Sequence, residues 1–171
     1  MIWRVVSDVL LRVRMQWWSL VYRGYRSRYA VADSFRFNGA GIQFIGGGQI
    51  IVGERSYVGE LTTLQSAPGC SISIGSDCSI SHNVRVYTSS AESNADLRLG
   101  APPLVIGSVA IGDGVWIGTN TYIGPGITIG SNAVVGANSV VTRSIPGDEI
   151  WGGVPARLIR RKRSDRIGNP E

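Results

Sequence analysis

Aliphatic residues recur at every sixth position through the middle of this chain. Between residues 111 and 141, isoleucine or valine occupies each position with this spacing, namely Ile111, Ile117, Ile123, Ile129, Val135 and Val141. Glycine directly follows the first five of them. A period of six is neither the 3.6-residue period of a helix nor the two-residue alternation of an ordinary strand. It indicates an internal repeat, which has to be interpreted before any single element.

Each six-residue unit predicts one short strand followed by a turn. The aliphatic side chain points inward and stacks on its counterpart in the next coil, while glycine or asparagine occupies the turn. Looser copies of the repeat precede the strict run, with aliphatic sites at Val52, Val58, Leu64, Ile74, Ile80 and Val86. The pattern therefore predicts an all-β fold, a parallel β-helix over residues 37–145 with nearly one-dimensional packing. An ordinary strand-rich domain with glycine turns is the alternative.

A polar segment interrupts the repeat between Val86 and Ile111. The strict run places its preceding aliphatic site at Val105, so residues 88–103 are predicted to form a loop inserted between coils. Loops that project from a rigid scaffold commonly carry function.

The two ends of the chain do not follow the six-residue period. Residues 2–22 have apolar positions three and four apart, which predicts an amphipathic helix that ends at Gly24 and is joined to the coils by a linker up to residue 36. This helix either packs on the β-helix end or on a neighbouring subunit, or lies on a membrane, which its arginines and tryptophans would suit. Residues 146–171 are expected to form a turn-rich exit, a short basic helix over 156–166 and a frayed end.

Composition limits the class of partner. The net charge of +5 is concentrated at the two ends, which favours an anionic partner such as a phosphorylated ligand or a membrane surface. No nucleic-acid recognition module is visible. Cys70 and Cys78 lack a metal-type spacing and are expected to be reduced core residues of a cytoplasmic protein. No 18-residue apolar run and no signal-peptide pattern stands out.

Three longer motifs resemble a known family. They are IGDGVWIG at 111–118, IGPGITIGSNAVVGANSVVTRSIP at 123–146 and GGVPARLIR at 152–160. The chain resembles the left-handed β-helix hexapeptide-repeat acyltransferases, in particular the sugar O-acetyltransferase branch with the galactoside, maltose, nodulation and polysaccharide acetyltransferases. The resemblance implies a homotrimer with active sites between neighbouring β-helices, and acetyl transfer from acetyl-CoA to a sugar hydroxyl without a metal.

Acetyl transfer to a hydroxyl requires a base for the hydroxyl proton and donors for the oxyanion. The only histidine is His82, in ISHNVRVYT, so it is the candidate base. The galactoside-type histidine falls on Ala91 in an ungapped comparison and does not carry over. A structural turn histidine, with the base elsewhere, therefore stays open. The adjacent Asn83 and the loop carboxylates of Glu92 and Asp96 are candidates for substrate binding, and the carboxylates have solvated loop positions as the alternative.

The residues expected to bind acetyl-CoA match the family motifs more closely than the candidate base does. It implies that Thr119, Ala137 and Thr142 line the pantetheine arm through backbone contacts, and that Arg143, Arg157 and Arg160 meet the phosphates and adenine. Arginine suits this task because its planar fork binds phosphate in a bidentate manner. Trp116 matches an aromatic residue near the thiol end, and a plain packing role is equally open.

Four functions compete at this point. The leading hypothesis is an O-acetyltransferase acting on a sugar of a cell-surface polysaccharide or its lipid-linked precursor, located in the cytoplasm at the inner face of the membrane. The others are an acetyltransferase of a small soluble acceptor, a zinc-dependent carbonic anhydrase, and a non-catalytic interaction module. The anhydrase is disfavoured because a single histidine cannot supply the ligands of such a site.

Overall fold

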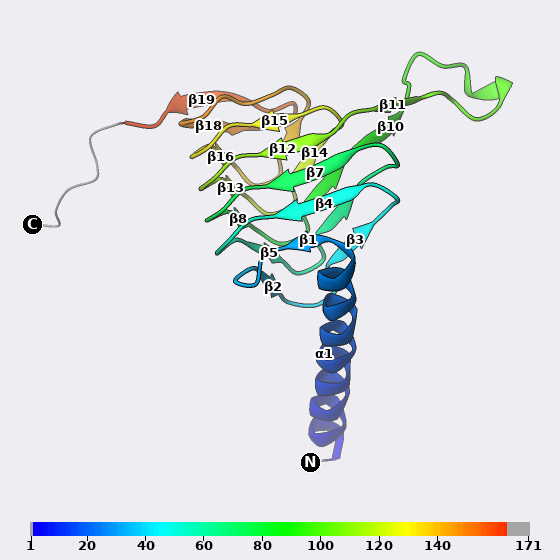
Figure 1. Ribbon diagram of the computed structural model, residues 1–171, viewed down its shortest axis with the longest axis vertical. Coiled ribbons are helices and arrows are strands. Elements are labelled where there is room, and N and C mark those ends of the chain that lie inside the picture. Colours follow the sequence, from blue (N-terminus) through cyan, green and yellow to red (C-terminus); the bar gives the residue numbers. More distant parts are fainter. Residues whose placement is uncertain (1, 164–171) are drawn as a thin grey trace, which may run out of the picture.

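A computed structural model describes residues 2–163 of the chain. It contains one long helix, α1 (Ile2–Arg28), followed by a parallel β-solenoid of five coils (Figure 1). The predicted β-helix is therefore confirmed. The solenoid begins at Ala30 and not at residue 37, because β1 (Ala30–Val31) already pairs with β4 of the second coil.

Every coil supplies three strands. Coil 1 contains β1, β2 (Arg36–Asn38) and β3 (Gln43–Ile45). Coil 2 contains β4 (Gln49–Val52), β5 (Tyr57–Gly59) and β6 (Thr63–Gln65). Coil 3 contains β7 (Ser71–Ile74), β8 (Ser79–Ile80) and β9 (Arg85–Tyr87). Coil 4 contains β12 (Val109–Ile111), β13 (Trp116–Ile117) and β14 (Tyr122–Ile123), and coil 5 contains β15 (Thr128–Ile129), β16 (Val134–Val135) and β17 (Val140–Val141).

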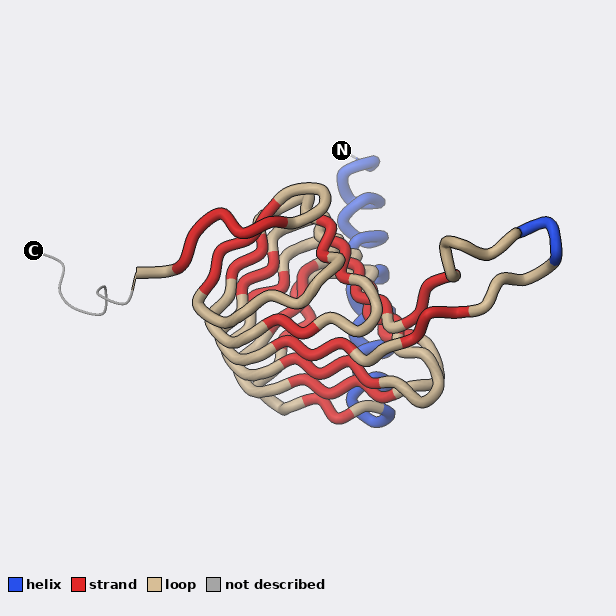
Figure 2. Tube along the Cα trace, turned by 90° about the horizontal axis from the view of Figure 1, so that it is seen from above, coloured by secondary structure: helices blue, strands red, loops and turns tan. Residues whose placement is uncertain are grey.

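Successive coils stack their strands into three parallel sheets. Sheet A has the order β1-β4-β7-β12-β15, sheet B contains β2-β5-β8-β13-β16, and sheet C contains β3-β6-β9-β14-β17. Figure 2 shows the successive coils as parallel traces, each displaced from the next. The turns between sheets form three edges that run the length of the solenoid, and these are called the A–B, B–C and C–A edges below.

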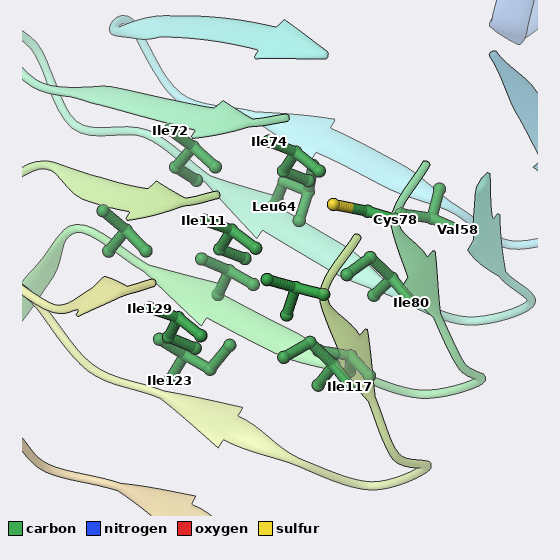
Figure 3. Packing of buried hydrophobic residues seen from close by; sticks show 14 of the residues in the cluster. Val58, Leu64, Ile72, Ile74, Cys78, Ile80, Ile111, Ile117, Ile123 and Ile129 are labelled. Carbon is green, nitrogen blue, oxygen red and sulfur yellow. The ribbon is translucent and has the colours of Figure 1, made fainter. Parts of the chain in front are cut away.

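The repeat positions fill the interior as the sequence predicts. Ile117, Ile123 and Ile129 are completely buried and stack with the isoleucines and valines of the neighbouring coils (Figure 3). Cys78 is also inside, with its thiol donating to the carbonyl of Gly112 at 3.0 Å. Burial raises the pKa of this thiol, so it stays protonated at neutral pH. Both cysteines are free and buried, as expected.

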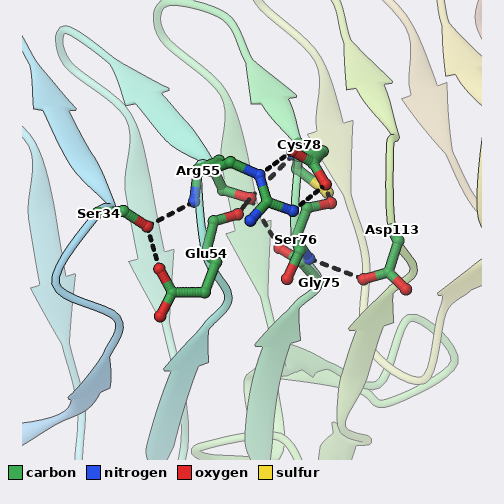
Figure 4. Close-up of polar contacts among 9 residues, drawn as sticks. Ser34, Glu54, Arg55, Gly75, Ser76, Cys78 and Asp113 are labelled. Atoms are coloured by element: carbon green, nitrogen blue, oxygen red, sulfur yellow. Dashed lines mark hydrogen bonds and ion pairs between the residues drawn. The ribbon is translucent and has the colours of Figure 1, made fainter.

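Side chains of successive coils cap one another at the A–B edge. The Asp113 carboxylate accepts the backbone N–H of Ser76 at 2.7 Å, and Ser34 accepts the N–H of Arg55 at 2.8 Å (Figure 4). Arg55 forms a bidentate pair with Asp77, and this cation lowers the pKa of the Asp77 carboxyl. Backbone donors that the turns leave free are thus satisfied by side chains one coil away.

Helix α1 covers the lower end of the solenoid with an aromatic cluster. Tyr22 stacks on Phe37 with ring centroids 4.3 Å apart, and Tyr25 stacks on Phe44 at 5.1 Å. The Tyr22 hydroxyl donates to the Gly39 carbonyl at 2.8 Å. The prediction that the helix ends at Gly24 was wrong, because this packing continues the helix to Arg28. Within residues 2–163, the structure contains no helix that meets the length and hydropathy of a membrane span.

The upper end is closed by two further strands. β18 (Glu149–Gly152) continues sheet B in parallel, and β19 (Arg157–Arg161) folds back antiparallel on it. The buried Glu149 accepts hydrogen bonds from Trp151 Nε1 at 2.8 Å and from Arg161 Nε at 3.1 Å. The predicted basic helix over 156–166 is therefore wrong for 157–161, where pairing with β18 satisfies the backbone. Residues 164–171 lie outside the described residues.

The inserted segment is confirmed and projects from the C–A edge as an arm. It contains β10 (Ser89–Ala91) paired antiparallel with β11 (Leu104–Ile106), and a short 3-10 turn η1 (Leu97–Leu99) at its tip (Figure 2). Val105 is therefore part of this hairpin and not a coil position, as its 45% exposure shows. The insertion is therefore a two-stranded hairpin and not a loop without regular structure.

Candidate functional site

The B–C edge brings together site residues predicted from separate motifs. His82 of coil 3, Thr119 of coil 4 and Ala137 of coil 5 occupy equivalent turn positions, one above the other. Their register is set by backbone hydrogen bonds, because the carbonyl of His82 accepts from Asn120 at 3.1 Å and that of Thr119 accepts from Asn138 at 2.8 Å. With coils about 4.8 Å apart, this column spans about 10 Å.

The His82 ring is held by the coil below it. The backbone N–H of Glu60 donates to Nδ1 of His82 at 3.0 Å. An imidazole nitrogen that accepts a hydrogen bond carries no proton, so the neutral ring has its hydrogen on Nε2. Nε2 has no hydrogen-bond partner among residues 2–163 and the side chain is exposed. In this conformation Nε2 is a donor, and action as a base requires the other tautomer.

Glu60 extends this column downward, and the sequence interpretation missed it. Its carboxylate pairs with the Arg14 guanidinium of α1 at 2.7 Å. Aligning the hexapeptides of successive coils, with the arm removed, places Glu60 below His82 and would have identified it. Because both side chains are substantially exposed, the Arg14–Glu60 pair adds little to the stability of the fold.

The column also holds a free backbone donor. At the A–B edge, the N–H of Asp113 is capped by Ser131 Oγ of the coil above at 3.1 Å. The N–H of Thr119 is in the equivalent place on the B–C edge, but the residue above it is Ala137, which has no acceptor. Within residues 2–163, no acceptor contacts the Thr119 N–H. This leaves the Thr119 N–H available to a ligand beside a small side chain.

The outer face of sheet B adjoins this edge and carries further predicted residues. Trp116 is exposed on β13 and stands in register with Val134, which is itself in register with Ile150. Arg160 pairs with Ile150 across β18 and β19. Ile150 and Arg160 line a basic pocket of about 520 Å³ together with two further cations, Lys162 and Arg163. Arg157 lies opposite Gly152, where β18 approaches the B–C edge.

Comparison with known proteins places this arrangement in a family. A model described as bacterial transferase hexapeptide (six repeats) matches residues 108–143. A hexapeptide-repeat-containing acetyltransferase of Vibrio cholerae O1 biovar eltor, solved with acetyl coenzyme A, is 30% identical with a TM-score of 0.74, covering 84% of this chain and 76% of its own. The chain belongs to the hexapeptide-repeat acetyltransferases.

Two further structures support this assignment. A maltose O-acetyltransferase from Clostridium difficile 630 is 34% identical to this acetyltransferase, with a TM-score of 0.61 and coverage of 77% of this chain and 72% of that one. A galactoside acetyltransferase in complex with coenzyme A is 29% identical, with a TM-score of 0.68 and coverage of 80% and 66%. The predicted family and enzyme class are therefore confirmed.

Other predicted residues lie elsewhere on the acetyltransferase. Thr142 and Arg143 follow β17 and occupy the C–A edge, as does the arm. Glu92 and Asp96 lie within the arm and make their hydrogen bonds there, and Arg98 pairs with Asp96 and lowers the pKa of its carboxyl. Within one chain, these residues are not brought to His82.

Asn83 has a structural part in this acetyltransferase. Its backbone has a positive φ of 54°, a conformation that asparagine tolerates better than most residues. Its amide donates to Asn120 at 2.8 Å, and Asn120 donates to Asn138 at 3.1 Å. This amide ladder ties coils 3 to 5 together beside the His82 column. A contact of Asn83 with substrate stays a prediction.

Proposed function

We propose that this enzyme transfers the acetyl group of acetyl-CoA to a sugar hydroxyl. The observation that carries the proposal is the B–C edge, which places His82 below a free backbone donor and borders sheet B, whose upper end carries a basic pocket. One relative with the same fold was solved with acetyl coenzyme A and a galactoside acetyltransferase was solved with coenzyme A, while a third relative is named as a maltose O-acetyltransferase.

The donor substrate fits the B–C edge and the top of sheet B. The pantetheine arm would run along the column, with its amide oxygen on the Thr119 N–H and its chain passing the small Ala137. Arg157 and Arg160 would meet the phosphates at the upper end, because guanidinium groups bind phosphate in a bidentate manner. Trp116 would pack near the same path.

The acceptor hydroxyl would meet His82 at the lower end of this path. Its proton passes to Nε2 of His82 as the oxygen attacks the thioester carbonyl, and the CoA thiolate leaves. For this step the ring must carry its hydrogen on Nδ1, so the contact with the Glu60 N–H has to be released when the acceptor binds. Backbone donors of the edge would stabilise the oxyanion.

We further propose a homotrimer in which neighbouring copies complete the site. In one chain, Thr142, Arg143 and the arm occupy the C–A edge, away from His82. A C–A edge of one copy that faces the B–C edge of the next would bring Arg143 to the donor and Glu92 and Asp96 to the acceptor. Closed cyclic assemblies of this kind use the same pair of surfaces at every interface.

For the acceptor, we propose a sugar of a cell-surface polysaccharide or its lipid-linked precursor. The support is α1, because its residues 2–22 form a basic helix with exposed apolar side chains that would suit contact with the cytoplasmic face of a membrane. The test is acceptor-dependent CoA release by the full chain with acetyl-CoA. Release with a lipid-linked glycan above that with free sugars supports the proposal. Release with only small soluble acceptors would overturn the choice of acceptor, and absence of CoA binding would overturn acetyl transfer.

The free Thr119 donor gives a specific prediction for donor binding. Ala137→Ser places a hydroxyl where Ser131 caps the equivalent N–H at the A–B edge. Capping the Thr119 N–H should weaken CoA binding by about five- to tenfold, since one hydrogen bond contributes about 1 kcal/mol. Calorimetric titration with CoA measures this. Ala133→Ser is unsuitable as a control because Ala133 is buried, so Ala30→Ser, the same change at an exposed position of sheet A in coil 1, serves instead. An unchanged affinity in Ala137→Ser would remove the Thr119 N–H from the proposed site.

A further inference from the structure

Helix α1 has a second apolar face that the solenoid does not use. The face that packs on coil 1 contains Trp18, Val21, Tyr22 and Tyr25. A different set, Val6, Val9, Val13, Trp17 and Leu20, is spaced by three and four residues and is here called the outer stripe. Residues two apart on a helix differ by about 200° in direction. Leu20 therefore points almost directly away from Tyr22, and the outer stripe faces away from the solenoid.

The outer stripe is exposed along its whole length. Trp17 and Leu20 are 64% and 62% exposed although they lie beside the packed aromatic cluster. A second row with seven-residue spacing, Trp3, Leu10 and Trp17, runs along one side of the stripe and is exposed as well. A large and continuous exposed apolar surface of this kind indicates a binding face.

Positive charge borders this surface. Arg12 and Arg23 flank the outer stripe, whereas Arg14 is paired with Glu60 and Arg4 lies on the opposite side of the helix. Asp8 is the only acidic residue of α1. Arg23 and Ser19 also line a pocket of about 300 Å³ between α1 and coil 1, on the flank of the helix. An anionic partner would therefore find cations next to the apolar rows.

We propose that the outer stripe docks on an anionic phospholipid surface, with α1 lying in the interface. The apolar rows enter the acyl boundary, Trp3 and Trp17 lie at headgroup level, and the arginines meet lipid phosphates. The breadth of the surface favours lipid over a second helix, because a coiled-coil seam needs only a narrow stripe of two positions in seven. The inference extends the membrane location proposed above and does not depend on acetyl transfer.

Docking in this way would place the candidate site close to the lipid surface. Arg14 of α1 pairs with Glu60, whose backbone holds the His82 ring. The helix therefore passes the lower end of the B–C edge, where the acceptor would bind. A lipid-linked acceptor could then reach His82 without leaving the membrane surface.

Flotation of the full chain with vesicles tests the inference. Phosphatidylcholine vesicles that contain phosphatidylglycerol are compared with vesicles of phosphatidylcholine alone. The test variant is Val13→Glu on the outer stripe, and the matched control is Leu11→Glu on another face. Both side chains are 55% exposed, so neither change disturbs the core and both add the same charge. Val13→Glu should lower affinity for anionic vesicles by about tenfold or more, while Leu11→Glu should change it less than about threefold.

The outcomes separate lipid from a second copy and from the catalytic proposal. Binding to anionic vesicles that is lost in Val13→Glu and kept in Leu11→Glu supports the inference. Equal loss in both variants, equal binding to neutral vesicles, or no vesicle binding overturns it. A smaller assembly of Val13→Glu by light scattering, without vesicle binding by wild type, would assign the stripe to a second copy. CoA release with a soluble acceptor should be unchanged in Val13→Glu, so loss of lipid binding and loss of acetyl transfer are told apart.

Discussion

Replacing His82 by alanine is expected to lower acceptor-dependent CoA release by about 10²–10⁴-fold, the range for a lost general base. The physical reason is that His82 is the chain's only imidazole and lies in the B–C column, where its Nε2 has no hydrogen-bond partner among residues 2–163. CoA affinity should stay within about twofold, because the donor contacts lie in the coils above. Steady-state turnover and calorimetric CoA titration measure the two quantities.

The structure offers a matched control for this variant. Ser76 occupies the same place in its hexapeptide as His82, one unit earlier, but at the A–B edge. Ser76→Ala should leave turnover unchanged. A His82→Ala enzyme with normal turnover would show that His82 serves only to hold the Glu60 turn, and the base would then be sought among the arm carboxylates of a neighbouring copy.

Gly118→Ala should be the most damaging single-methyl change at the candidate site. A Cβ at Gly118 would lie 2.4 Å from the backbone nitrogen of Ala137 and 2.8 Å from its Cα. Backbone cannot rotate away as a side chain can, so coils 4 and 5 would have to separate at the B–C edge. We expect a loss of about 3 kcal/mol in the free energy of unfolding, at the upper end of overpacking costs. Urea denaturation measures the stability, and CoA titration should show a parallel loss of binding.

Gly124→Ala is the control, since Gly124 follows Ile123 as Gly118 follows Ile117. The nearest atom to a Cβ at Gly124 is 3.6 Å away, an ordinary contact. It should cost less than about 1 kcal/mol. Equal destabilisation by both variants would mean that a general loss of glycine, and not the close approach of coils 4 and 5, sets the cost.

The core of the fold could be predicted from the sequence because one physical rule repeats in every coil. The aliphatic side chain at every sixth position points into the interior of the coil. Ile111, Ile117 and Ile123 are buried as that rule requires. The two ends of the chain lack the six-residue repeat, so this rule could not predict their structure. Arg157–Arg161 is a strand because β18 offers it a pairing edge, and α1 continues past Gly24 because aromatic residues of coil 1 pack against Tyr25 and Tyr29. These partners are distant in the sequence.

The candidate site was predictable in part for the same reason. His82, Thr119 and Ala137 were each chosen from a motif, and the three-sheet coil aligns them. The period of six does not specify how many strands a coil has or from which edge the arm projects. It therefore could not show that Arg143 lies on a different edge from these three residues. The hydrogen bond from the Glu60 N–H to Nδ1 of His82 also depends on coil stacking, so the tautomer of His82 could not be predicted from the sequence.

The two capped ends of the solenoid have a consequence for self-association. A stack of parallel strands is open at both ends, and bare ends could join copies end to end into filaments. Here the aromatic face of α1 covers the first coil, and β19 runs against the direction of the stack with Arg161 bound to Glu149. The terminal strands β1, β2 and β3 thus lie at the end that α1 covers, and sheet B ends in an antiparallel strand, which disfavours growth of a filament along the axis. The sides of the solenoid are left as the surfaces through which copies can associate.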